Sequence, residues 1–85
     1  YDVTYTDNMQ VHANGQKLLN HKVFLSVGHD EYWSKEMRDH VEAARNAAKN
    51  LAFFSANTCY WRVRFESSTL AAGQVKPDRV MACYK

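Results

Sequence analysis

The sequence has few of the residues that mark a specialised class of protein. It contains only two cysteines, one proline and three glycines in 85 residues. Two cysteines cannot form the disulfide framework of a small secreted domain or a complete set of metal-binding thiolates. We therefore predict that Cys59 and Cys83 are reduced thiols, since a disulfide between them would require an oxidising compartment.

The sequence also lacks a strong net charge and a long apolar run. Eleven basic and nine acidic residues give a net charge of +2, and the basic residues are scattered. This balance gives no argument for binding nucleic acid or an anionic membrane. No apolar run approaches the roughly 20 residues that a membrane-spanning helix needs. The hydrophobic content of 46% is enough for one domain or part of one.

Two similar stretches organise the rest of the chain. Residues 23–34, VFLSVGHDEYWS, and residues 51–61, LAFFSANTCYW, each read as a buried strand followed by polar and aromatic residues. If the two strands are parallel neighbours, Tyr32 and Tyr60 come to the same level at one edge of a sheet. In open α/β sheets, ligands bind at the edge beyond the carboxyl ends of the strands.

A helix is predicted between these strands, over residues 35–49. Ser34 is a favourable N-cap, and Glu36 in the first turn complements the helix dipole. Asn50 is expected to end the helix in the left-handed conformation. The apolar residues on one face recur at helical spacing: Met37, Val41, Ala44 and Ala48. Strand, helix and strand then form a right-handed βαβ unit.

The remaining segments are assigned from composition and alternation. Residues 1–6 alternate and predict a strand, and residues 9–19 predict a short, interrupted helix. Residues 61–66 alternate between apolar and charged side chains, as expected for an exposed or edge strand. Residues 67–78 are small and polar and predict a loop, whereas residues 79–84 predict a final strand.

Polar residues at the end of the first central strand are candidates for chemistry. His29, Asp30, Glu31 and Tyr32 carry groups that bind hard or borderline cations or act as acids and bases. The alternative is structural: Asp30 and Glu31 cap the following helix or face solvent, and His29 hydrogen-bonds the loop.

Cys59 does not have the setting of a nucleophile. A nucleophile elbow places its Cys or Ser at a tight turn flanked by glycines. Here the turn at residues 55–58 contains no glycine and no thiol. Tyr60 by itself is a core aromatic residue. The other histidines are expected to be solvated: His12, His21 and His40.

The motifs GHDEYWS, VEAAR and NLAFFSANTCYWRVRFE resemble the C-terminal domain of the N,N-dimethylformamidase large-subunit-like family, with residues 1–85 covered. The resemblance implies a three-layer α/β/α fold with a mainly parallel sheet, similar to class I glutamine amidotransferases, of which this chain would be a part. The segment SANTCYW falls where an amidotransferase carries its cysteine elbow. Asn57 stands there in this sequence, so thiol chemistry is not implied.

The resemblance also implies a reaction. The family would hydrolyse a small N-substituted amide at a mononuclear iron held by two tyrosines and a glutamate. Tyr32 and Tyr60 match the two tyrosines by motif, and the glutamate ligand is expected outside this chain. His29, Glu31 and Asn57 would orient substrate or water. Neither nucleic acid nor a membrane is expected as a partner.

The rival hypothesis is a non-catalytic α/β domain that binds a carbohydrate or a protein partner. Lys49 and Asn50 replace a glycine that the family usually has before the second central strand, and the following turn lacks its paired glycines. Under either hypothesis one sheet face lacks a helix to cover it. We expect the rest of a larger chain or a second copy to cover that face, and the isolated chain to be inactive.

Overall fold

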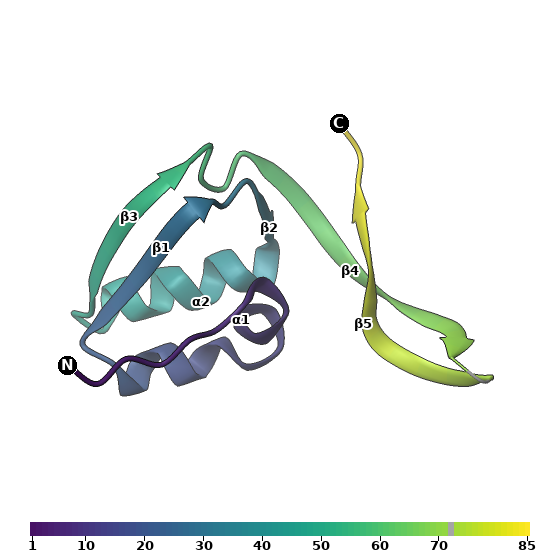
Figure 1. Ribbon diagram of the computed structural model, residues 1–85, viewed down its shortest axis with the longest axis horizontal. Helices are drawn as coiled ribbons and strands as arrows, with labels where there is room; N and C mark the ends of the chain where they lie inside the picture. Colours follow the sequence, from purple (N-terminus) through teal and green to yellow (C-terminus); the bar gives the residue numbers. More distant parts are fainter. Residues whose placement is uncertain (72) are drawn as a thin grey trace.

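The computed structural model describes residues 1–71 and 73–85. The elements in chain order are α1 (Asn8–Asn14), the 3-10 helix η1 (Gly15–Asn20), β1 (Val23–His29), β2 (Tyr32–Ser34), α2 (Lys35–Asn46), β3 (Asn50–Ala56), β4 (Trp61–Ala71) and β5 (Gln74–Cys83). Strands β1 and β3 form a two-stranded sheet, and β2, β4 and β5 form a three-stranded sheet in the order β2-β4-β5. The helices lie on one side of β1 and β3, and the β4–β5 hairpin extends away from them (Figure 1).

The predicted βαβ unit is confirmed. Strands β1 and β3 are parallel, with partners running from Val23 and Asn50 to His29 and Ala56. Helix α2 connects β2 to β3 and packs against both strands. Two apolar runs separated by a capped amphipathic segment therefore predicted this part of the fold correctly.

Helix α2 begins as its sequence predicts and ends earlier. The Ser34 hydroxyl oxygen accepts a hydrogen bond from the backbone N–H of Met37 at 3.1 Å, which satisfies one of the free donors of the first turn. The residue in the left-handed conformation after the helix is Ala48, with φ of 62°, and not Asn50. Asn50 is instead the first residue of β3, paired with Val23.

The hydrophobic core lies between the helices and the sheet. Its buried side chains come from α1, β2 and α2: Val11, Trp33, Met37 and Val41. Phe24 and Leu51 of the two parallel strands pack against this cluster from the sheet side. Each element of the βαβ unit therefore contributes to a single core.

Gly15 lets the first two helical segments approach α2. A Cβ atom at this position would lie 2.3 Å from Cγ of His40, so any larger residue would force one of the two segments to move. His40 is consequently half-buried, and the prediction that it is solvated is only partly correct.

The predicted three-layer α/β/α fold with a mainly parallel sheet is wrong for this chain. The five described strands form two small sheets, and the two longest strands, β4 and β5, pair antiparallel. Adding another parallel strand requires a crossover of a dozen or more residues. After Trp61 the chain instead continues as a strand and returns as a hairpin. In the part of the chain that the structure describes, the helices cover one face of β1 and β3.

Two local predictions are also wrong, and a third is correct only in part. Residues 1–6 are exposed and form no strand, because no sheet edge pairs with them in the described structure. The predicted loop over residues 67–78 consists largely of the second half of β4 and the first half of β5, apart from Ala72, which lies outside the described residues. The third concerns β4, which is not an edge strand because it lies between β2 and β5, although its charged side chains Arg62, Arg64 and Glu66 are exposed as predicted.

The face of β1 and β3 that points away from the helices is apolar. We call Val23, Leu25, Val27 and Phe54 the open face. Val27 and Phe54 are paired across the two strands and are 68% and 72% exposed. Parallel strands are normally covered on both faces.

Within residues 1–71 and 73–85, no helix is long and apolar enough to cross a membrane.

The core predicts that two methionines differ in their contribution to the free energy of unfolding. Replacing Met37, which is 2% exposed, by alanine should lower the free energy of unfolding by about 2–5 kcal/mol because it leaves a cavity. Met9→Ala in α1 removes the same side chain from a position that is 38% exposed, and should change stability by only about 0.5 kcal/mol. Urea denaturation of both variants measures the difference, and equal effects would show that Met37 is not part of the core.

Candidate functional site

The candidate site lies where β1 and β3 end together. Three backbone hydrogen bonds continue the pairing beyond the strands: Asp30 N–H donates to Ala56 O at 3.3 Å, Cys59 N–H to Asp30 O at 2.9 Å, and Trp61 N–H to Glu31 O at 3.0 Å. The two chain segments therefore stay side by side as they pass from the first sheet into the second. This edge is the carboxyl end of a parallel pair, where ligand sites are commonly found.

The register between the two segments changes at this edge. Paired residues are 27 positions apart in β1 and β3 but 29 apart in β2 and β4. The two additional residues are accommodated in a short loop where Asn57 and Cys59 have φ of 50° and 56°. As a result Tyr32 lies opposite Trp61, and Tyr60 lies in the loop beside this pair.

The structure brings together the three residues that were predicted to orient substrate or water. Asn57 Nδ2 donates a hydrogen bond to His29 Nε2 at 3.1 Å, and His29 Nδ1 lies 3.6 Å from Glu31 Oε2. Because an amide nitrogen can only donate, Nε2 accepts and the ring proton is on Nδ1, facing the carboxylate. The His29 side chain is 56% exposed and that of Glu31 is 15% exposed, so the imidazole is more accessible than the carboxylate.

A second polar network lies beneath this cluster and was not predicted. The Ser26 hydroxyl donates to Asp30 Oδ2 at 2.6 Å and lies 3.0 Å from the Ser55 hydroxyl. Ser55 in turn lies 2.7 Å from the hydroxyl of Thr58. Ser26 is 4% exposed, so its partners satisfy a buried group and rigidify the turn. The sequence feature that could have predicted this network is a serine within each of two otherwise apolar strands.

Tyr32 is in contact with the last residue of the chain. Lys85 Nζ donates to the Tyr32 hydroxyl oxygen at 2.8 Å. The same ammonium group lies 5.2 Å from the ring centroid of Tyr32 and 5.6 Å from that of Trp61. The hydrogen bond to Tyr32 raises the pKa of Lys85, so the ammonium group stays charged beside the two rings.

Tyr60 has different surroundings. Its ring is 68% exposed and packs edge-on against Trp61, with centroids 5.4 Å apart. Tyr60 and Trp61 line a groove of about 340 Å³ between α2 and the start of β4. Arg38 on the wall of the groove donates to Glu42 at 2.8 Å, and this hydrogen bond raises the pKa of the Arg38 guanidinium. Tyr32 is not one of the residues that line this groove.

Tyr32 and Tyr60, the two residues that the resemblance assigns to iron, can be tested for their fit to such an ion. Phenol oxygens suit a ferric ion, and Tyr32 and Tyr60 come from adjacent chain segments. The nearby carboxylate of Glu31 already faces His29. Within residues 1–71 and 73–85, no group of three or more His, Cys, Asp or Glu side chains is placed to hold a metal ion. Among the described residues, Tyr32 and Tyr60 are therefore not accompanied by a ready cluster of further ligands.

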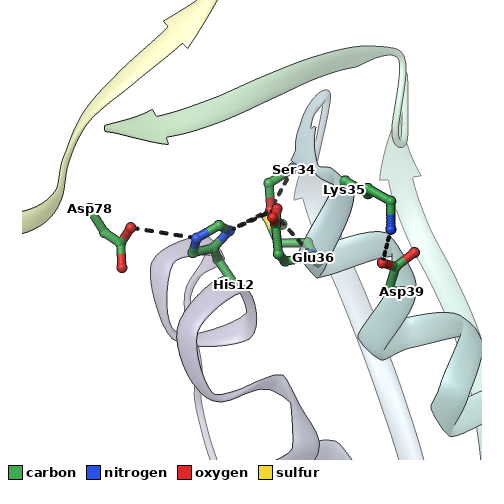
Figure 2. Close-up of polar contacts among 7 residues, drawn as sticks. His12, Ser34, Lys35, Glu36, Asp39 and Asp78 are labelled. Carbon is green, nitrogen blue, oxygen red and sulfur yellow. Dashed lines mark hydrogen bonds and ion pairs between the residues drawn. The ribbon is translucent and has the colours of Figure 1, made fainter. Parts of the chain in front are cut away.

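The predicted states of the cysteines and of two histidines can be compared with the structure. Both cysteines are free in the described structure, as predicted. His21 is exposed, as predicted. His12 is not solvated: its side chain is 14% exposed and lies among polar residues of three elements (Figure 2). This cluster was missed because its members are far apart in the sequence.

Comparison with known proteins gives one match. The family model described as N,N-dimethylformamidase beta subunit-like, C-terminal, matches residues 1–85. No curated protein and no solved structure matches the chain. The resemblance to the formamidase family is confirmed over the whole chain, with the description of a beta subunit-like C-terminal region in place of the large subunit.

The hydrogen bond between Asn57 and His29 predicts which ring nitrogen of His29 carries the proton. Asn57→Gly keeps the left-handed backbone but removes the amide donor, so the proton of His29 should move from Nδ1 toward Nε2. Long-range ¹H–¹⁵N NMR of the imidazole measures this change. Asn20→Gly at the end of η1 is the control, and an unchanged His29 spectrum in Asn57→Gly would contradict the contact.

Proposed function

The chain belongs to the N,N-dimethylformamidase beta subunit-like, C-terminal family, and on that premise we propose that it is part of an amide hydrolase acting on a small N-substituted amide. Hydrolysis adds water to the carbonyl carbon and breaks the C–N bond, with a proton passing from the water to the leaving amine. We assign to this chain a group that takes up and returns the proton at an accessible edge.

The observation that supports this proposal is the grouping of His29, Glu31 and Asn57 at the carboxyl edge of β1 and β3. Asn57 fixes the imidazole of His29 through Nε2. Glu31 lies on the Nδ1 side, where it favours the proton on that nitrogen. His29, whose ring is open to solvent, is the residue that we assign to proton transfer, and Nε2 takes up the proton when Asn57 gives up its hydrogen bond. Glu31 and Asn57 are assigned to its orientation.

We further propose that Tyr32 and Tyr60 are two ligands of an iron ion whose third ligand comes from outside this chain. When bound, such an ion supplies Lewis-acid chemistry at the amide carbonyl and lowers the pKa of a bound water. The charged Lys85 ammonium beside the Tyr32 hydroxyl is compatible with an anionic oxygen at that position. Iron binding would require Lys85 to give up its hydrogen bond to Tyr32.

The family description supports the proposal that the chain works as part of a larger protein. The match is to a C-terminal, subunit-like region, so polypeptide outside this chain is expected in such proteins. We assign the open face of β1 and β3 to contact with that polypeptide, because exposed apolar area of this kind marks an interaction surface.

One observation favours the rival hypothesis of a non-catalytic binding domain. The groove beside α2 combines the exposed ring of Tyr60 and the ring of Trp61 with the charged side chains of Arg38 and Glu42. Aromatic platforms flanked by polar side chains suit a carbohydrate or a protein partner. Under this hypothesis the groove binds its partner and the edge at His29 has no chemical role.

The iron content of the full-length protein separates the two functions. We expect the protein to contain iron with visible absorbance from tyrosinate ligation. Tyr32→Phe and Tyr60→Phe should each lower bound iron and amide hydrolysis by roughly tenfold or more. Tyr5→Phe is the control, since that residue is 92% exposed in the unstructured N-terminal segment. Colourless full-length protein that retains its fold would favour the binding domain.

The open face predicts how the isolated chain behaves. Without its covering polypeptide the chain should self-associate, and Val27→Lys together with Phe54→Lys should restore a monomer. Val75→Lys on β5 replaces a valine of similar exposure, 66%, away from the open face and should not do so. Sedimentation velocity measures all three, and a monomeric unmodified chain would refute the proposed role of this face.

A further inference from the structure

His12 of α1 is surrounded by groups from the start of α2 and from the β4–β5 hairpin (Figure 2). Its Nδ1 lies 2.8 Å from the Ser34 hydroxyl oxygen and 3.5 Å from Glu36 Oε2. On the other side of the ring, Nε2 lies 3.5 Å from Asp78 Oδ1. The edge of Phe65 packs against the ring with centroids 4.8 Å apart. The imidazole is therefore held in one orientation by its surroundings.

Ser34, the residue that His12 contacts, is buried and has two structural roles. It is the last residue of β2 and the N-cap of α2, it is 1% exposed, and its hydroxyl oxygen accepts the N–H of Met37. That hydroxyl is buried and already holds the helix end, so a nucleophilic role assisted by His12 and Asp78 does not fit. What His12 can do is fix the rotamer of the Ser34 side chain.

Helix α1 makes a second contact with the same strand. Asn8 Nδ2 donates to the backbone oxygen of Tyr32 at 3.2 Å. Together Asn8 and His12 contact the first and last residues of β2, which has three residues and, within residues 1–71 and 73–85, pairs only with β4. Strands this short have little stability of their own. Contacts from α1 therefore hold the segment that carries Tyr32 opposite Trp61.

We propose that His12 is a positioning residue, which acts through Ser34 to hold the segment carrying His29, Glu31 and Tyr32 in the geometry that the site needs. This inference rests on the proposed function for its effect on activity. Its structural part, the link between His12 and Ser34, is independent of it. The essential contact is through Nδ1, and the contact of Nε2 with Asp78 serves to orient the ring.

Two substitutions separate the nitrogens of His12 in the full-length protein. The carboxamide of His12→Asn reaches the position of Nδ1 and keeps the contact with Ser34, whereas that of His12→Gln reaches the position of Nε2 and keeps the contact with Asp78. We expect His12→Gln to lower kcat for a small N-substituted amide on the order of tenfold to a hundredfold with little change in KM. His12→Asn should stay close to the unmodified protein. His21→Gln, at an exposed histidine, is the matched control.

Hydrogen exchange of the peptide covering residues 30–38 is the second measurement. It should accelerate in His12→Gln and remain unchanged in His12→Asn and His21→Gln, because the Met37 amide depends on the position of the Ser34 oxygen. Equal loss of kcat and of protection in both His12 variants would assign a general structural role and overturn the proposal, as would unchanged exchange in His12→Gln. If the unmodified protein cleaves no amide, the proposed function fails, and the exchange rates alone decide whether His12 holds the segment.

Discussion

The parallel hydrogen bonding of β1 with β3 is the interaction on which the other features depend. Because the two strands run in the same direction and end together, the residues that follow them must emerge at one edge. Helix α2 connects the two segments and closes the unit on one face, where its buried side chains meet Phe24 and Leu51. The backbone bonds of Asp30, Cys59 and Trp61 then carry the pairing into the second sheet. The backbone pairing alone therefore brings His29 and Asn57 to the same edge.

Much of this unit could be predicted because its signals are local. The spacing of Met37, Val41 and Ala44, the cap at Ser34 and the apolar strands each depend on neighbouring residues. The hairpin was missed for the opposite reason. Residues 67–78 have the composition of a loop and include Pro77, but β4 and β5 supply each other with hydrogen-bonding partners, and this non-local pairing overrides the weak local preference. Residues 1–6 show the converse, since strand-like alternation forms no strand without an edge to pair with.

The sequence likewise predicted one part of the candidate site and missed another. His29, Glu31 and Asn57 do lie together, because strand ends specify an edge even when side-chain contacts are unknown. The supporting residues were not foreseen. Ser26 and Ser55 are 29 positions apart and His12 and Ser34 are 22 apart, and single serines and histidines carry no pattern that would join them. The pairing of Tyr32 with Trp61 in place of Tyr60 likewise depends on the backbone conformation of Asn57 and Cys59, which periodicity does not encode.

The length of the short loop between Ala56 and Trp61 affects the candidate site but not the pairing of the first sheet. The pairing of β1 with β3 is complete before the loop, so a change in loop length leaves that pairing in place and shifts the register of β2 with β4. Adding or deleting one residue there would change which aromatic side chain stands opposite Tyr32. Loop length therefore selects the side chains that meet at this edge, while the βαβ scaffold stays the same.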